Sequence, residues 1–137
     1  MTNVKLIKSF LLGSVLLCNS VFALEYTIYV TGNAAAGSTY TQGNSIDGQC
    51  VGTPSTKHLV ITCTSDGTGN INVFGTINVS TSCHYTIGVL NAKGNGIIGS
   101  CAGIVQTNDI PPIPNPGNAK WKIELNSSAS ANLNTPK

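Results

Sequence analysis

Apolar and polar side chains alternate along most of this chain, and this period of two is the feature that most constrains its fold. In "EYTIYVT", residues 25–31, Tyr26, Ile28 and Val30 fall on one side of an extended strand. Such alternation is typical of a strand with one face packed and one face in water. The same pattern predicts strands at residues 57–64, 71–80, 83–90 and 120–126, with a glycine-rich strand at 96–106.

The segments between these strands carry residues that favour turns. "DGTGN" at 66–70 and "NAKGNG" at 91–96 supply Asp, Asn and Gly, and we interpret both as hairpin loops. Residues 32–49 are small and polar, and the proline-rich segment 108–118 cannot be a central strand because proline has no amide donor. We expect both segments to be irregular. The sequence therefore predicts an all-β fold, a small antiparallel β-sandwich or barrel of about six to seven strands.

The first residues have the layout of a cleavable secretory signal peptide. Lys5 and Lys8 precede a short apolar run, and Val21-Phe22-Ala23 ends it with small residues at the positions that signal peptidase requires. We predict cleavage after Ala23, a single β-domain over residues 24–126 and a flexible C-terminal tail over 127–137. The apolar run is too short to span a membrane. The expected location is secreted or periplasmic, with no stable membrane insertion after cleavage.

Removal of residues 1–23 changes the charge of the chain. The formal net charge of +2 loses Lys5 and Lys8 and becomes zero, and no arginine is present. A neutral chain offers no basic surface for nucleic acid. The low content of charged residues, 9%, instead suits binding by hydrogen bonds and stacking.

Four cysteines remain after cleavage: Cys50, Cys63, Cys83 and Cys101. An even number in a small exported chain indicates a framework of two disulfides. Three pairings are possible, and joining nearest neighbours, Cys50 to Cys63 and Cys83 to Cys101, is the one that we favour. The long gaps between the cysteines do not match zinc-site spacings, so we expect no metal site and no cofactor.

The adjacent pair Cys83 and His84 raises the question of a catalytic thiol. Neighbours on a strand point to opposite faces, so the two side chains diverge, and an oxidising compartment removes the free thiol that such a site needs. His58 and His84 are the only possible imidazole bases, and neither lies in a known catalytic motif. No catalytic residue is therefore assigned.

We expect a binding module, with a glycan or another protein as ligand, rather than an enzyme. Tyr29 falls opposite the apolar side of its strand, and Tyr29, Tyr40 and His84 are the candidate ligand-binding residues. One alternative is a small hydrolase with an unrecognised site around a histidine. Another is an assembly subunit that pairs through an edge strand such as 25–31. The oligomeric state is left open.

Overall fold

The computed structural model describes residues 25–65, 69–90, 94–109 and 119–128. This part of the chain forms nine strands rather than six to seven. Their bounds are β1 Glu25–Thr31, β2 Thr39–Asp47, β3 Gln49–Pro54, β4 Leu59–Thr64, β5 Asn72–Ser80, β6 Cys83–Leu90, β7 Gly94–Ile98, β8 Ile104–Asp109 and β9 Ala119–Ser127.

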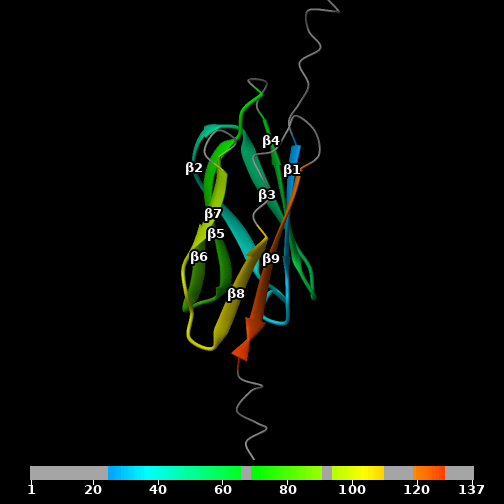
Figure 1. Cartoon of the computed structure of the whole chain (residues 1–137), viewed down its shortest axis with the longest axis vertical. Helices are drawn as coiled ribbons and strands as arrows, with labels where there is room; N and C mark the ends of the chain where they lie inside the picture. Colours follow the sequence, from blue (N-terminus) through cyan, green and yellow to red (C-terminus); the bar gives the residue numbers. More distant parts are fainter. Residues whose placement is uncertain (1–24, 66–68, 91–93, 110–118, 129–137) are drawn as a thin grey trace, which may run out of the picture.

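The strands form two sheets that pack face to face as a sandwich. Sheet A has five strands in the order β3-β4-β1-β9-β8, and sheet B has four in the order β2-β5-β6-β7. In Figure 1, β2, β5, β6 and β7 lie on the left, and β1, β4 and β9 lie on the right. The predicted all-β sandwich is confirmed, with one departure from an antiparallel fold. That departure is the pair of β1 and β9, which run parallel.

The core lies between the sheets and consists of the apolar sets that the period of two selects. Sheet A contributes alternate residues of β1, β4 and β9, among them the fully buried Trp121, and sheet B contributes alternate residues of β5 and β6. Each fully buried large apolar side chain stabilises the fold by roughly 1.5–3 kcal/mol. The alternation in the sequence thus identifies the buried face of these five strands.

Two disulfides are present, and their pairing is the favoured one. Cys50 and Cys63 are direct partners on the neighbouring strands β3 and β4. Cys83 opens β6 and is joined to Cys101, in the segment that leads from β7 in sheet B to β8 in sheet A. Both bridges tie together segments that are close in sequence, with separations of 13 and 18 residues.

Several predicted segments were wrong in detail. Residues 32–49 are not irregular throughout, because they contain β2, whose small polar residues pair with β5 through two register shifts. The predicted strand 96–106 is two strands in different sheets, β7 and β8, separated by Gly99 and Gly103 at positive φ. Strand β1 is paired on both sides, with β4 and β9, so residues 25–31 are not an edge.

The turns are partly described. β6 and β7 form the hairpin predicted around 91–96, with Leu90 paired with Gly94. Residues 66–70 do not close a hairpin, because β4 and β5 belong to different sheets. The predicted signal peptide, residues 110–118 of the proline-rich segment and residues 129–137 of the predicted tail lie outside the described residues, and β9 itself extends to Ser127. No helix within the described ranges has the length and apolar character to cross a bilayer.

Candidate functional site

The outer face of sheet B carries a trough that runs across its strands. The register aligns Phe74 of β5 with Gly88 of β6, and Gly88 with Gly96 of β7. One row across three strands therefore consists of an aromatic ring followed by two residues without side chains. The result is a hollow of about 200 Å³, the sheet B trough, lined by Phe74, Thr86, Gly88, Leu90, Gly96 and Ile98.

The position of the Phe74 ring depends on the glycine beside it. A Cβ atom at residue 88 would lie 3.3 and 3.4 Å from two carbons of the Phe74 ring. The ring thus lies against the main chain of β6 in space that a side chain at residue 88 would occupy. Phe74 is 42% exposed although it is large and apolar, so one part of it remains available to a ligand.

The floor and walls of the trough follow from the neighbouring rows. A Cβ atom at Gly96 would have no other atom within 4 Å, so the floor opens to solvent there. Thr86 pairs with Ile98 on one side of the glycine row, and Leu90 pairs with Gly94 on the other. Ile98 is 79% exposed, which leaves one wall of the trough uncovered.

A cluster of uncharged polar side chains lies further along the same face. Asn78 Nδ2 donates to Thr41 Oγ1 at 3.0 Å, and Asn78 Oδ1 lies 3.1 Å from His84 Nδ1. Asn78 and His84 are cross-strand partners, and they are separated from the Phe74–Gly88 row by the pair Thr76–Thr86. The face therefore offers hydroxyl, amide and imidazole groups beside an aromatic ring.

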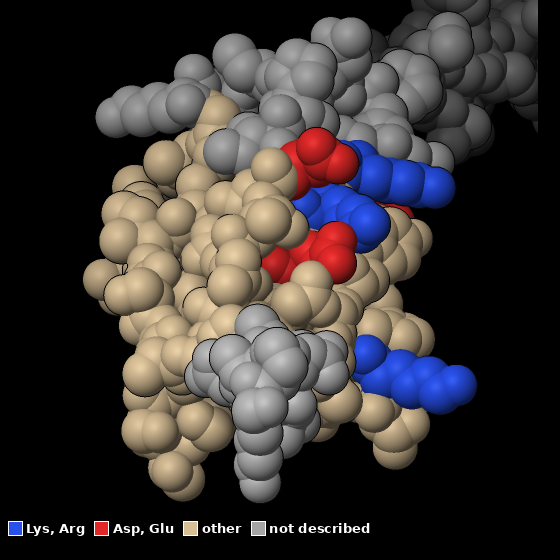
Figure 2. All heavy atoms as spheres, turned by 60° about the horizontal axis from the view of Figure 1, so that its bottom comes forward, with Lys and Arg blue, Asp and Glu red and all other residues tan. Residues whose placement is uncertain are grey.

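The charged residues of the described chain gather on the other sheet. Lys120, Lys122, Glu124 and Asp109 belong to β8 and β9 of sheet A, whereas Asp47 is the only charged residue in the strands of sheet B. Figure 2 shows acidic and basic side chains side by side in one group, with a further basic side chain apart from it, while most of that view is uncharged. The described strands of sheet B therefore present little fixed charge to a ligand.

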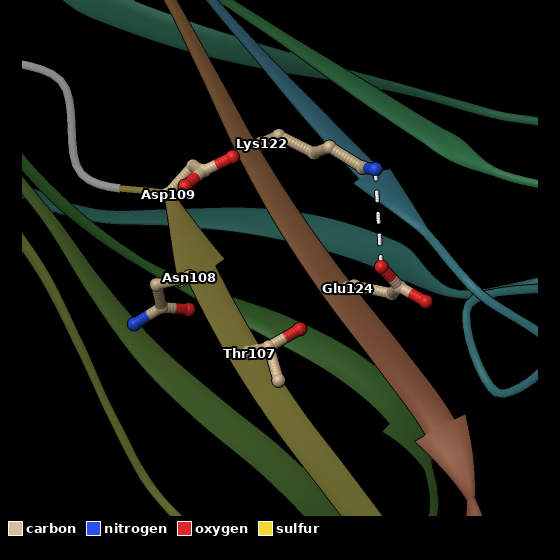
Figure 3. Close-up of a pocket in the computed structure, with 5 residues that line it drawn as sticks. All are labelled: Thr107, Asn108, Asp109, Lys122 and Glu124. Carbon is tan, nitrogen blue, oxygen red and sulfur yellow. Dashed lines mark ion pairs between the residues drawn. The ribbon is translucent and has the colours of Figure 1, made fainter.

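A second hollow, of about 110 Å³, lies on β8 and β9 and is lined by Thr107, Asn108, Asp109, Lys122 and Glu124. In Figure 3 the Lys122 side chain reaches toward Glu124, with Nζ 3.8 Å from Oε2, and away from Asp109. Both partners are well exposed, so this ion pair is solvated and contributes little to stability. The described residues contain no group of three His, Cys, Asp or Glu that could hold a metal ion.

The three residues selected from the sequence do not meet in one site. Tyr29 lies on the outer face of sheet A, where it is 38% exposed between Val60 and Lys122. Tyr40 turns inward, packs against the core and lies over Gly75. Burial raises the pKa of Tyr40 to about 12. His84 is on the outer face of sheet B, on the same face as the trough.

The arrangement gives no support to a histidine-centred catalytic site. His84 lies on sheet B beside an amide, which cannot serve as nucleophile, and His58 is in the turn between β3 and β4 of sheet A. The hydroxyl of Ser55 accepts from the His58 amide at 3.0 Å and donates to its carbonyl at 2.8 Å, so it closes a turn. Cys50, Cys63, Cys83 and Cys101 are all oxidised, so none offers a thiol.

Sequence reasoning missed Phe74, the central residue of the trough. The signal was present, because Phe74 shares its strand parity with Asn72, Thr76 and Asn78, opposite the apolar set. A large aromatic residue on the polar side of an alternating strand is a candidate contact. The glycines at positions 88 and 96 gave no such signal, because only the register of three strands brings them beside Phe74.

Comparison with known proteins supports the fold but assigns no family. No protein-family model and no curated protein sequence matches the chain. The structure is similar to the crystal structure of IP-1A from Alcaligenes faecalis, with a TM-score of 0.52 and 8% sequence identity over 78% of this chain and 93% of that one. At this identity the likeness concerns the two-sheet architecture alone.

Proposed function

We propose that this protein is an exported, non-catalytic binding module that holds a neutral glycan on the outer face of sheet B. The observation that carries the proposal is the row Phe74–Gly88–Gly96, an exposed aromatic ring beside a floor of glycines. The described strands of this face have one charged residue, Asp47, which pairs with Asn72 at 3.0 Å.

The chemistry of a sugar ring matches this surface. A pyranose has an apolar face of C–H groups, which packs on the face of an aromatic ring, and hydroxyl groups around its edge. A floor of glycines lets the pyranose ring approach the main chain closely. Thr86 beside the trough, and Asn78 and His84 further along the strands, have side chains that donate and accept hydrogen bonds.

Export to an oxidising compartment is part of the proposal. Two intramolecular disulfides are typical of extracellular and periplasmic proteins. The lysine-containing start and short apolar run of residues 1–23 have the layout of a secretory signal. Together they support a secreted or periplasmic binding module.

A glycan array probed with the purified protein tests the proposal. We expect binding to neutral glycans that Phe74→Ala weakens by at least about tenfold, since a central aromatic contact is worth more than about 1.4 kcal/mol. Tyr29→Ala is the matched control, because Tyr29 is similarly exposed but lies on sheet A. Equal loss from both variants, or retention of binding by Phe74→Ala, would contradict the assignment of the site.

A protein ligand is a second candidate, favoured by one observation. Leu90 and Ile98 make two walls of the trough apolar, and an aliphatic side chain from a partner protein fits such a hollow. If the array shows no binding while immobilised wild-type protein retains a partner that Phe74→Ala does not, this second function replaces the first.

A further inference from the structure

The sandwich has four edge strands, and they differ in how they are protected from pairing with other chains. Strands β3 and β8 border sheet A, and β2 and β7 border sheet B. An unprotected edge is a template for another strand, and proteins block it with bulges, charges, proline or covering segments.

Three of the four edges carry such protection. The Cys50 amide of β3 donates to Gln42 Oε1 of β2 at 2.7 Å, and β3 ends at Pro54. Strand β2 has two register shifts against β5. Strand β8 carries consecutive polar residues up to Asp109 and borders the ion pair of Lys122 and Glu124.

Within the part of the chain that the structure describes, the fourth edge, β7, has none of these features. Its sequence, Gly94-Asn95-Gly96-Ile97-Ile98, contains no charge and no proline, and its pairing with β6 is regular over five residues. The disulfide between Cys83 and Cys101 fixes the segment that follows it. Its one long outward side chain, Ile98, is 79% exposed and apolar. The free edge of β7 can therefore pair with a strand of another chain.

The outward residues of β7 are complementary to themselves when the strand is reversed. In an antiparallel pair centred on Gly96, Ile98 of one copy lies opposite Gly94 of the other. Gly94 is the row partner of Leu90 in its own chain. Because glycine has no side chain, Ile98 of one copy reaches over Gly94 to Leu90 of the other.

We propose that β7 pairs with β7 of a second copy of this chain, and that the pair forms a homodimer with a continuous eight-stranded sheet. The two-fold axis passes between the two Gly96 residues, since this register pairs all five residues of each β7 strand and places each Ile98 opposite Gly94. The two troughs then share one floor of glycines with a Phe74 ring at each end. The dimer does not depend on the identity of the ligand.

Sedimentation of the purified protein across concentrations up to about 1 mM tests the dimer. We expect a concentration-dependent mass of two chains, and Ile98→Asp raises its dissociation constant by at least about tenfold because a buried isoleucine is replaced by a charge. Val105→Asp is the matched control, since Val105 is also an exposed apolar residue on an edge strand, β8 of sheet A, and its replacement leaves β7 unchanged. A mass of one chain at every concentration overturns the proposal.

A cysteine at residue 96 tests the register. Gly96 has ordinary backbone angles and free space for a Cβ atom, so Gly96→Cys keeps the fold. Two such residues face each other across the axis, so we expect an intermolecular disulfide under mild oxidation. Ile98→Cys is the control, because two residues at position 98 lie four pairs apart, and equal cross-linking of both variants overturns the register. Glycan binding by either variant is measured separately, so failure of the dimer and failure of the glycan site are distinguishable.

Discussion

Phe74 and Gly88 are cross-strand partners, and the ring of Phe74 lies 3.3 Å from the place where a Cβ atom at residue 88 would be. This contact holds the ring at the end of the sheet B trough. A methyl group at residue 88 leaves the ring a few tenths of an ångström too close, so the ring must move.

The first prediction concerns this pair. Gly88→Ala shifts the ring resonances of Phe74 in NMR spectra and weakens ligand binding, because the ring turns away from the floor of the trough. Gly96→Ala is the control for the ring resonances alone, since a Cβ atom at residue 96 meets no neighbour within 4 Å. Unchanged ring resonances in Gly88→Ala would show that the ring does not rest on residue 88.

The second prediction concerns a hydrogen bond between the sheets. Asn95 Nδ2 of β7 donates to the hydroxyl of Tyr26 of β1, and both residues are buried. Asn95 Oδ1 has no partner among the described residues, so loss of the Tyr26 acceptor would leave the whole amide unpaired. Tyr26→Phe therefore lowers the free energy of unfolding by about 1–3 kcal/mol. Urea denaturation measures this loss, and the exposed Tyr29→Phe should stay within about 0.5 kcal/mol of wild type.

The third prediction separates the two disulfides. Replacing Cys83 and Cys101 by alanine releases the segment that follows β7, so amide hydrogen exchange accelerates in residues 94–98 more than in 59–64. Replacing Cys50 and Cys63 has the opposite pattern, because that bridge joins β3 to β4. Each double variant loses about 3 kcal/mol of stability by the chain-entropy account. Equal acceleration in both segments would mean that the bridges act only globally.

The fourth prediction concerns alkaline pH. Burial raises the pKa of Tyr26 and of Tyr40 to about 12, from 10 in the unfolded chain. Above pH 10 the unfolded state loses these protons while the folded state keeps them, so stability is full below pH 10 and falls between pH 10 and 12. The slope is up to about 1.4 kcal/mol per pH unit for each tyrosine.

Tyr40→Phe isolates one of these two groups. Between pH 10 and 12 the free energy of unfolding of this variant should fall less steeply with pH, by the contribution of one tyrosine. Its stability at pH 7 should be nearly unchanged. Urea denaturation at several pH values measures both. A slope identical to wild type would indicate that Tyr40 ionises equally in both states.

Much of the fold could be predicted from the sequence because the alternation of apolar and polar residues along a strand indicates which of its sides is buried. The alternation in residues 25–31 and 83–90 identified the sides that are buried. The even number of cysteines indicated two disulfides but left three pairings open, and the favoured nearest-neighbour pairing is the one observed. Strand β2 was not predicted because the residues on both of its sides are mostly polar or glycine and its pairing with β5 shifts register twice, so no apolar alternation marks it. The parallel pairing of β1 with β9 joins segments almost 100 residues apart, and no local signal encodes it.

The candidate site was harder to predict because it depends on which strands lie side by side and in which register. Tyr29 and Tyr40 were selected as aromatic residues, but parity alone cannot tell which sheet a strand joins or whether its outer side is covered. Phe74 matters because two glycines from other strands lie beside it, and this depends on register. His84 was placed on its correct outer face by parity, yet its neighbour Asn78 became evident only from the pairing of β5 with β6.

The central claim is that ligands occupy the outer face of sheet B, and an NMR titration tests it most directly. Isotope-labelled protein is titrated with a neutral oligosaccharide that binds on the array, and backbone amide shifts are mapped on the sandwich. The account predicts that the largest shifts cluster at Phe74, Gly88 and Gly96, with little change at Tyr29 and Lys122. Shifts centred on β8 and β9, or on the outer face of β1, would contradict it.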